Sequence, residues 1–285
     1  MRKFTVVLLV AMSIMTIALG TGSCTDKKPV AVKDSMTLDS AQIDSVLDDS
    51  AESIIAETPM PKAADELFDD FVFNFAANKK LQFKRIHFPL PVYRNGKVAK
   101  YITQRRWKME HFFMRQDFYT LIFDNHKQMN LVKDTTVSHA IIEKIYLQEK
   151  LVKQYLFNRV NGKWQMTSIN YKSMHENQNS SFLNFYSSFA TDTAFQRQHL
   201  HTPVKFSGPD PDDDFETMTG DIAPETWPAF APPLPSGMIY NIIYGQKYRE
   251  SNQKLFVVRG IANGLETELT FKRVKGKWLL TQLNT

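Results

Sequence analysis

The feature that most constrains the fold is an internal similarity at a constant spacing of 114 residues. Two blocks fall into register at this spacing without gaps, one near the start of a unit and one near its end. The matching pairs of the first block are Phe68/Phe182, Phe71/Phe185, Phe75/Phe189, Ala76/Ala190, Gln82/Gln196, His87/His201 and Pro89/Pro203. The matching pairs of the second block are Phe157/Phe271, Arg159/Arg273, Val160/Val274, Gly162/Gly276, Lys163/Lys277, Trp164/Trp278, Thr167/Thr281 and Asn170/Asn284. Because one register governs both ends, we expect a tandem repeat whose copies span residues 64–175 and 176–285.

The middles of the two copies have diverged. Trp107 and Trp227 match only at a spacing of 120 residues, so the second copy has gained residues before this tryptophan and lost them after it. The acidic, proline-containing segment Gly208–Glu216 is the natural place for the gain.

Each copy begins with an amphipathic helix. Phe68, Phe71 and Phe75 recur at the spacing of one helical face, and their counterparts in the second copy repeat this spacing. Asp65-Glu66 and Asn179-Ser180 stand where side chains commonly cap a helix N-terminus, so we expect capping from both pairs.

Each copy ends in strands. Residues 141–160 read as one long strand, and Asn161-Gly162 then makes a two-residue hairpin turn, because this pair adopts positive φ readily. The second copy repeats the pattern with strand 269–274, a Lys275-Gly276 turn and strand 278–283. Helices followed by antiparallel strands indicate the α+β class, with N-terminal helices packed on a curved antiparallel sheet in each copy.

The N-terminus reads as an export signal, residues 1–23. Arg2 and Lys3 precede an apolar run from Phe4 to Leu19, which is shorter than the ~20 residues that a membrane span needs. The alternative is a true transmembrane anchor. The stretch before Cys24 resembles a lipobox, and Cys24 is the only cysteine, so we expect lipid attachment there. Thr25 follows in place of the aspartate that retains some lipoproteins at the inner membrane, which favours the outer membrane.

Residues 24–63 read as a disordered acidic tether. Residues 24–66 hold ten acids against four lysines, and the stretch 25–63 has no aromatic residue. Such a segment buries too little apolar surface to offset the entropy of ordering. It therefore suits a spacer between a lipid anchor and a folded body.

The closing hairpins carry a family resemblance. Gly162-Lys163-Trp164 and Gly276-Lys277-Trp278 resemble the final strand hairpin of the NTF2-like (cystatin-like cone) fold. The two copies behind a lipoprotein signal also resemble the DUF4348 family of Bacteroidetes envelope proteins, over roughly residues 64–285. The resemblance implies two tandem NTF2-like units. It brings no established activity or catalytic residues.

Positive charge is concentrated in the first copy. Residues 67–175 hold nineteen lysines and arginines against eight acids, whereas residues 176–285 hold ten against twelve. A basic patch is expected from Lys79, Lys80, Lys84, Arg85, Arg105 and Arg106. An exported, tethered chain is not expected to bind nucleic acid. Anionic lipid headgroups or polysaccharide phosphates are the possible partners of such a patch. The alternatives are a solubilising basic face, or docking of this patch on the acidic loop of the second copy.

One acidic segment offers a metal site. Asp210, Asp212 and Asp214 alternate, and Asp221 lies eleven residues beyond the first, which echoes a calcium loop. Phe215 stands where such a loop needs glycine, so a solvated acidic insertion is the alternative. No other cofactor is expected.

The sequence contains no recognised catalytic motif. Tyr240, Tyr244 and Tyr248 lie near an apolar strand, where tyrosines belong to a core or its rim. These observations favour a non-catalytic module that binds a small ligand, a glycan or an envelope protein. The alternative is a periplasmic NTF2-like enzyme, such as an isomerase, dehydratase or hydrolase.

Overall fold

The computed structural model describes residues 65–285, except 211, 214, 249 and 250. The predicted signal peptide, Cys24 and the tether therefore lie outside the described residues, as does Asp214. Within the described part of the chain, no helix is both long enough and apolar enough to cross a membrane.

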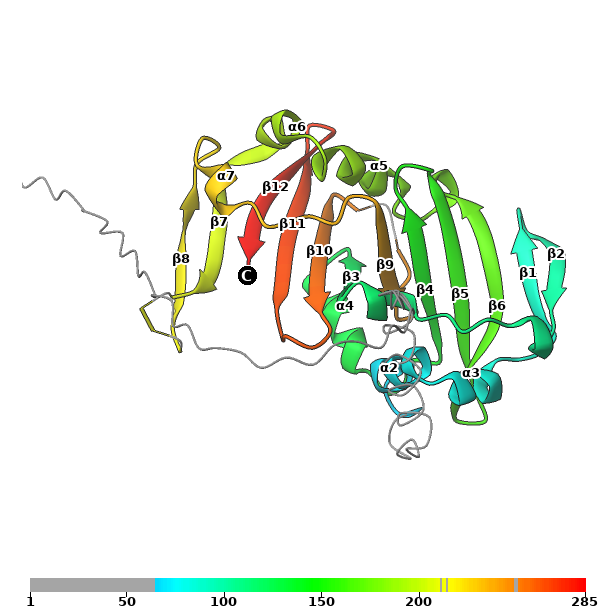
Figure 1. Ribbon diagram of the computed structural model, residues 1–285. Helices are drawn as coiled ribbons and strands as arrows, with labels where there is room; N and C mark the ends of the chain where they lie inside the picture. Colours follow the sequence, from blue (N-terminus) through cyan, green and yellow to red (C-terminus); the bar gives the residue numbers. More distant parts are fainter. Residues whose placement is uncertain (1–64, 211, 214, 249–250) are drawn as a thin grey trace, which may run out of the picture. The chain divides into compact units, whose positions relative to one another are not determined.

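In the described part of the chain, each half has two α-helices followed by six strands, with short helices between some of them (Figure 1). The first half contains α2 (Phe68–Ala77), α3 (Lys79–Arg85), β1 (Leu90–Arg94), β2 (Lys97–Ile102), η2 (Gln104–Arg106), η3 (Phe112–Arg115), β3 (Phe118–Phe123), α4 (His126–Met129), η4 (Asn130–Lys133), β4 (His139–Tyr146), β5 (Leu151–Val160) and β6 (Lys163–Ser173). The second half contains η5 (Met174–Glu176), α5 (Ser180–Phe189), α6 (Thr193–Gln198), β7 (Leu200–Pro209), β8 (Thr217–Ile222), α7 (Trp227–Phe230), β9 (Met238–Ile243), β10 (Gln253–Gly260), β11 (Glu266–Val274) and β12 (Lys277–Asn284).

The twelve strands form one sheet, in which the third strand of each half is exchanged. The order is β2-β1-β6-β5-β4-β9-β3-β10-β11-β12-β7-β8. Strand β9 of the second half pairs antiparallel with β4, and β3 of the first half pairs antiparallel with β10. The exchanged strands meet in the middle through a single parallel pair, Thr120 and Asn241. The α+β class is confirmed, whereas two separate tandem units are not, because neither half keeps a sheet of its own.

Two aromatic cores lie on opposite faces of this sheet. The first contains Phe71 and Phe75 of α2, and the second contains Phe182 and Phe189 of α5. Successive side chains of a strand point to opposite faces, so the central strands serve both cores. In β10, for example, Leu255 and Val257 belong to the first core, and Phe256 belongs to the second.

The predicted helix faces are buried, but the predicted caps are wrong. Helix α2 begins at Phe68 after Leu67, without a side-chain cap, and α5 follows Asn179, again without one. Asp65 is used differently: its carboxylate accepts hydrogen bonds from the Arg85 guanidinium at 2.6 and 2.8 Å. The pair is nearly buried, so an ion pair between the end of α3 and the segment before α2 replaces the cap.

The hairpin turns follow the sequence. Asn161 and Gly162 have φ of 50° and 76°, and Lys275 and Gly276 have φ of 49° and 81°, as a type I′ turn requires. The single long strand predicted over 141–160 is wrong, since β4 ends at Tyr146 and β5 begins at Leu151. The turn between them contains no glycine, and Lys150 takes a positive φ of 52°.

Candidate functional site

A buried glutamine fixes the loop that carries the candidate site. Gln82 of α3 is fully buried, and its side-chain nitrogen donates to the carbonyls of Phe75 and Glu110 at 3.0 and 2.8 Å. Its oxygen accepts from Trp107 Nε1 at 3.0 Å and from the Glu110 backbone at 3.2 Å. The two hydrogen bonds with Glu110 hold its backbone against α3, and the one with Trp107 fixes the indole.

A row of cations and tyrosines crosses five neighbouring strands below Glu110. The register aligns Arg94 of β1 with Tyr171 of β6, Tyr171 with Lys153 of β5, Lys153 with Lys144 of β4, and Lys144 with Tyr240 of β9. Residues aligned in this way point to the same face of a sheet. We call these five residues the cation–tyrosine row. Its last member comes from the exchanged strand, so the row needs both halves of the chain.

Each cation of the row lies over a tyrosine ring. The Arg94 guanidinium lies 4.7 Å from the centre of the Tyr171 ring. The Lys153 ammonium lies 4.5 Å from the centre of the Tyr155 ring, and the Lys144 ammonium lies 5.2 Å from that of Tyr240. Such contacts hold cations in place without neutralising them.

Glu110 is the carboxylate over this row. Its Oε2 accepts a very short hydrogen bond from the Tyr155 hydroxyl and lies 3.5 Å from Lys153 Nζ, and its Oε1 lies 3.5 Å from the Tyr240 hydroxyl. Burial by itself would raise the pKa of Glu110, but the Tyr155 hydrogen bond and the two lysines lower it below its usual value. Glu110 is therefore a stable carboxylate and a weak base at neutral pH.

The lysines respond to burial and to each other. Burial lowers the pKa of Lys153, Glu110 raises it in part, and Lys144 lowers it further, with a net decrease. The pKa of Tyr240 is raised to about 12, chiefly by burial, so its hydroxyl stays protonated. The site therefore offers ammonium and hydroxyl donors at neutral pH.

A cavity of about 250 Å³ opens beside the row. Its lining includes Lys153, Tyr171 and Glu110, together with the indole of Trp107. Three further cations line it: Lys100, Arg106 and Lys108. Four cations thus face one carboxylate among the described lining residues, and the cavity favours an anionic ligand.

The deep interior of the first half is not available to a ligand. Phe71 and Phe75 pack edge to face on Phe157, with ring centres 6.0 and 5.4 Å apart. Phe68 packs in the same way on Phe157 and Trp164, at 5.3 and 4.9 Å, and all five rings are buried. A large apolar ligand inside the cone has no room here. The polar cavity at its edge is the better candidate.

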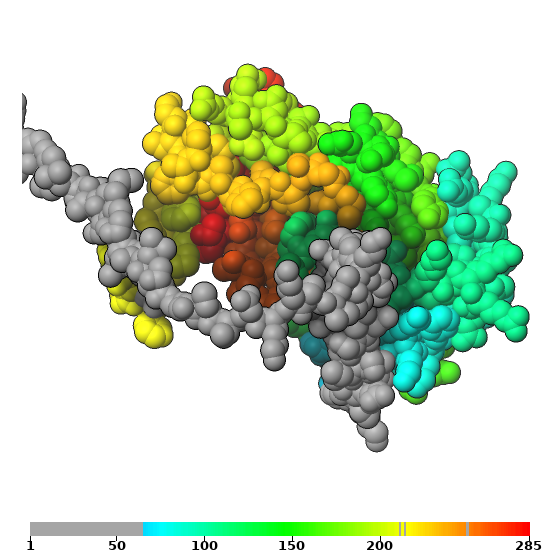
Figure 2. Space-filling model, in the orientation of Figure 1, coloured from blue at the N-terminus to red at the C-terminus, as the bar shows by residue number. Residues whose placement is uncertain are grey.

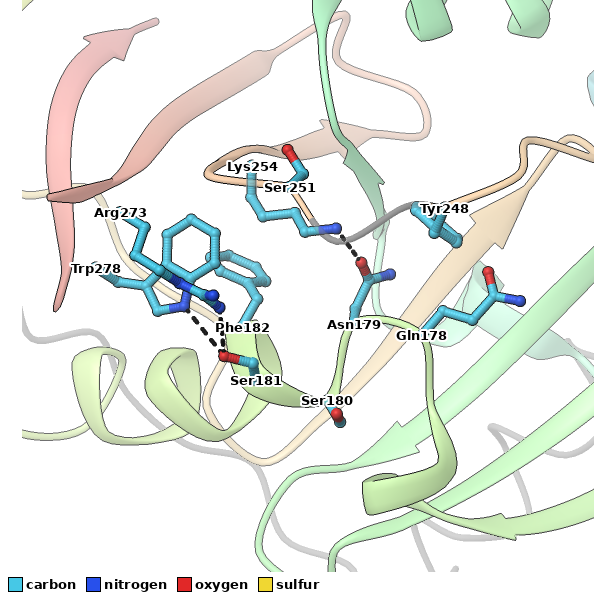
Figure 3. A pocket seen from close by; sticks show the side chains of 10 residues that line it. All are labelled: Gln178, Asn179, Ser180, Ser181, Phe182, Tyr248, Ser251, Lys254, Arg273 and Trp278. Carbon is cyan, nitrogen blue, oxygen red and sulfur yellow. Dashed lines mark hydrogen bonds between the residues drawn. The ribbon is translucent and has the colours of Figure 1, made fainter. Parts of the chain in front are cut away.

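A second cavity, of about 350 Å³, lies at the start of α5 (Figure 3). Its lining includes Asn179 and Ser181 from the start of the helix, Lys254 from β10, and Arg273 and Trp278 from β11 and β12. Lys254 donates to Asp124 at 2.5 Å and to Asn179 at 2.6 Å. This cavity shares no lining residue with the first.

The basic patch predicted from the sequence is divided in the structure. Lys79, Lys80 and Lys84 lie exposed on α3, and Arg105 and Arg106 lie exposed on η2, but Arg85 is nearly buried against Asp65. Of the six, only Arg106 lines the cavity. Figure 2 shows the β1–β2 hairpin (teal) and the β7–β8 connection (yellow) at opposite ends of this face. Docking of the basic patch on the acidic loop of the second copy stays a prediction.

The predicted calcium ligands lie on and before β8. Asp210 accepts a hydrogen bond from the backbone of Asp212 at 2.9 Å, and Asp221 pairs with Lys205 at 2.6 Å. Asp214 lies outside the described residues. Among the residues that are described, no group of three or more His, Cys, Asp or Glu side chains is arranged to hold a metal ion. Calcium binding stays a prediction.

Sequence reasoning missed Lys144, Lys153, Tyr155 and Glu110. The available signal was the pattern Lys144-Ile145-Tyr146 and Lys153-Gln154-Tyr155, which places lysine and tyrosine on one face of two adjacent strands. The sequence predicts Tyr240 at a core or its rim in the second copy. The structure places it beside β4 of the first half.

The arrangement of helices on a curved mixed sheet is that of an NTF2-like protein. The described chain is similar to the crystal structure of an NTF2-like protein from Bacteroides fragilis NCTC 9343, with a TM-score of 0.72 and 38% sequence identity. The match covers 79% of this chain and 98% of that one. The family model for DUF4348, a domain of unknown function, matches residues 47–285, and the chain belongs to this family. A comparison with curated proteins gave no match.

Proposed function

We propose that this protein is a lipid-anchored, non-catalytic binding module of the bacterial cell envelope, and that its cation–tyrosine row holds an acidic glycan. The observation that carries the proposal is the placement of Lys144 directly opposite Lys153 on neighbouring strands. Like charges in that position destabilise a sheet. An anionic ligand relieves this repulsion when it binds, and Glu110 relieves it in part when the site is free.

The aromatic rings that line the cavity are suitable for contact with a sugar. Tyr171 and Trp107 line the cavity beside Lys153, and both are partly exposed. Aromatic side chains give an apolar surface next to a polar edge, and a sugar ring is likewise apolar on its face and polar at its rim. Carboxylate or sulfate groups on such a ring would meet the four cations of the lining.

The state of Glu110 favours binding over catalysis. A general base works best when its pKa lies near the working pH, and burial usually supplies that increase. The pKa of Glu110 is shifted in the other direction, by the Tyr155 hydroxyl and the lysines. Glu110 therefore serves better to orient the lysines than to accept a proton.

The anchor is proposed from the N-terminal sequence. Arg2, Lys3 and the apolar run before Cys24 support export and lipidation, and Thr25 supports the outer membrane. The Cys24→Ala substitution should move the protein from the membrane fraction to the soluble fraction after cell lysis. Unchanged membrane retention would contradict the lipid anchor.

We infer that the chain arose by tandem duplication of one NTF2-like unit, with copies at 64–175 and 176–285. A repeated contact supports this. Trp107 Nε1 donates to Gln82 Oε1 at 3.0 Å, and Trp227 Nε1 donates to Gln196 Oε1 at 3.0 Å. The reciprocal exchange of β3 and β9 also fits two originally identical units that traded one strand.

The glycan proposal is tested with the purified full-length protein and two polymers. Polygalacturonate should bind in isothermal titration calorimetry and weaken as salt rises, whereas neutral dextran should not bind. Lys144→Gln and Lys153→Gln should each reduce the affinity about tenfold, since a charge-assisted hydrogen bond contributes about 1.5 kcal/mol or more. Lys163→Gln, an exposed lysine at the β5–β6 turn, is the control. Unchanged affinity in the Lys144→Gln, Lys153→Gln double variant would overturn the proposal.

Glu110→Gln separates binding from catalysis. A binding site gains affinity for an acidic polymer when its one carboxylate is neutralised, because a repulsive charge is removed. An enzyme that used Glu110 would instead shorten the polymer, and the substitution would stop this while leaving binding intact. Size-exclusion chromatography of the polymer after incubation distinguishes the two.

A further inference from the structure

A third cavity, of about 400 Å³, lies on the other face of the sheet from the first cavity, which opens beside the cation–tyrosine row. Val92 of β1 and Ile169 of β6 line the first cavity, whereas the next residues along the chain, Tyr93 and Asn170, line the third. Successive residues of a strand point to opposite faces, so the two cavities lie back to back across β1 and β6. We call the third cavity the back cleft, and its walls are Tyr93 and Gly96 of the β1–β2 hairpin, Leu156 of β5, and Ser168, Asn170 and Lys172 of β6.

The two cavities meet at Tyr171, which lines both of them. Tyr171 is aligned with Arg94, and this is the last pair that joins β1 to β6. Beyond it β1 turns back through Asn95-Gly96 into β2, whereas β6 continues to Ser173 (Figure 1). The strand pairing that separates the two cavities therefore ends at Tyr171. A linear ligand can pass from one cavity to the other around this end.

The polar side chains of the back cleft are not engaged elsewhere in the described part of the chain. The hydroxyls of Tyr93 and Ser168 make no hydrogen bond there, and the Lys172 ammonium has neither a hydrogen bond nor an ion pair. Tyr93 and Lys172 are partly exposed, beside the partly exposed apolar side chain of Leu156. The back cleft thus offers one unpaired cation, two hydroxyls and an apolar surface to a ligand.

The second half of the chain provides an internal comparison. It has a cavity of about 560 Å³ lined by Gln282, which the 114-residue register places where the first half has Ser168. The Gln282 amide donates to Asn284 Oδ1 at 2.9 Å. Among the described residues of that lining, the one cation is Lys205, and it is paired with Asp221 at 2.6 Å. The second half therefore uses these groups within the chain, whereas the first half leaves its cation and hydroxyls for a ligand.

We propose that the acidic glycan held by the cation–tyrosine row is a linear polymer, and that the back cleft binds further acidic sugar units of the same polymer. This inference rests on the proposed function of the row. The polymer passes around Tyr171 from the first cavity into the back cleft. There Lys172 binds a carboxylate or sulfate group, Tyr93 and Leu156 contact the apolar face of a sugar ring, and Ser168 bonds to a sugar hydroxyl. The cleft follows β6 from Ser168 to Lys172 over about 13 Å, which fits an extended chain better than a compact ligand.

The ligand's length is the first variable of the test. The full-length protein is titrated by isothermal calorimetry with oligogalacturonates of increasing defined length, at constant ionic strength. Short oligomers should bind in the first cavity, where four cations line the wall. Affinity should rise once the chain is long enough to reach the back cleft, because the second contact is then intramolecular. Long oligomers should bind one per protein molecule.

Two variants distinguish the back cleft from general attraction of a long polyanion to a basic surface. Lys172→Gln should reduce the affinity for long oligomers about tenfold, and the loss should be confined to them. Tyr93→Ala should act in the same direction through the lost ring contact. Lys272→Gln removes the same charge from an exposed position on β11 and should bind long oligomers as wild type does. The melting temperature of Lys172→Gln without ligand should equal that of wild type, because this lysine has no partner in the described part of the chain.

The outcomes separate this inference from the proposed function of the row. Wild-type affinity of both Lys172→Gln and Tyr93→Ala for long oligomers would overturn the polymer path while binding to the row stands. Equal affinity of wild type for short and long oligomers would do the same. If oligomers of no length bind, both the proposed function and this inference are wrong.

Discussion

Asn241 Nδ2 donates to Glu143 Oε2 at 3.0 Å, across the strand pair that joins the two halves of the chain. The other oxygen, Oε1, accepts from Gln154 at 2.9 Å and from Asn177 at 2.8 Å. Glu143 is 1% exposed, so one buried carboxylate ties together β4, β5, β9 and the segment between the halves. Burial raises its pKa, although the three amides lower it in part.

Glu143→Gln should stabilise the protein at neutral pH. The folded-state pKa of Glu143 lies above its unfolded value, so its contribution to stability is fully present below about pH 4.5 and is lost as the pH rises through the folded pKa. Asn241 can turn its unpartnered Oδ1 toward the new amide. The free energy of unfolding in urea should exceed that of wild type by about 1 kcal/mol or more at pH 7, and match it near pH 4.

Glu149→Gln is the matched control, because Glu149 is exposed in the turn after β4. It should leave the free energy of unfolding unchanged at both pH values. A Glu143→Gln variant that is less stable than wild type at pH 7 would show that the three amide hydrogen bonds outweigh the cost of burial.

The strand exchange predicts that neither half folds alone. A fragment 64–175 lacks β9, and a fragment 176–285 lacks β3, so each loses the neighbour of its β4 or β10. Each fragment should show no cooperative thermal transition by circular dichroism. Co-expressed fragments should form a one-to-one complex by size-exclusion chromatography. Cooperative unfolding of either fragment by itself would contradict this expectation.

Local features of this fold could be read from the sequence, whereas strand partners could not. The phenylalanine periodicity and the Asn-Gly and Lys-Gly turns act within a few residues, so they are visible in one sequence. Strands β3 and β9, Phe118–Phe123 and Met238–Ile243, are both largely apolar, and nothing in either sequence selects one neighbour over the other. Their exchange depends on pairs of residues that lie 92 to 142 positions apart.

The candidate site could not be predicted either, because it also depends on which strands pair. Lys144 and Lys153 were counted only as charge, since nothing local shows that the turn at Lys150 brings them opposite each other. That turn has no glycine, so the strand read as continuous. For Arg85 the sequence predicts an exposed position in a basic patch, whereas the structure pairs it with Asp65. This partner lies 20 residues away in sequence, so nothing local indicates the pair.

Gln82→Ala should destabilise the protein more than Gln196→Ala. Gln82 makes four hydrogen bonds with Phe75, Trp107 and Glu110, whereas Gln196 makes two, with Phe189 at 2.7 Å and Trp227 at 3.0 Å. Each buried group left without a partner costs about 1 kcal/mol or more. The difference should appear as a lower urea midpoint for Gln82→Ala. Only this variant should also weaken polygalacturonate binding, because Gln82 holds the indole of Trp107, which lines the cavity. Equal losses of stability would mean that the two hydrogen bonds of Gln82 to the Glu110 backbone contribute nothing.

Asp69 should titrate near pH 6. Burial raises its pKa to about 6, although the Tyr244 hydroxyl, which donates to Oδ1 at 2.6 Å, and Arg259 lower it in part. Its contribution to stability is therefore fully present below pH 3.8 and is lost as the pH rises through 6. Carbon-13 NMR of the Asp69 carboxyl should give a midpoint near 6. Tyr244→Phe should move it higher, because the hydrogen bond to the carboxylate is lost. Asp70→Asn should lower it slightly, because the neighbouring negative charge of Asp70 contributes to the increase. A midpoint near 4 in wild type would contradict the burial of Asp69.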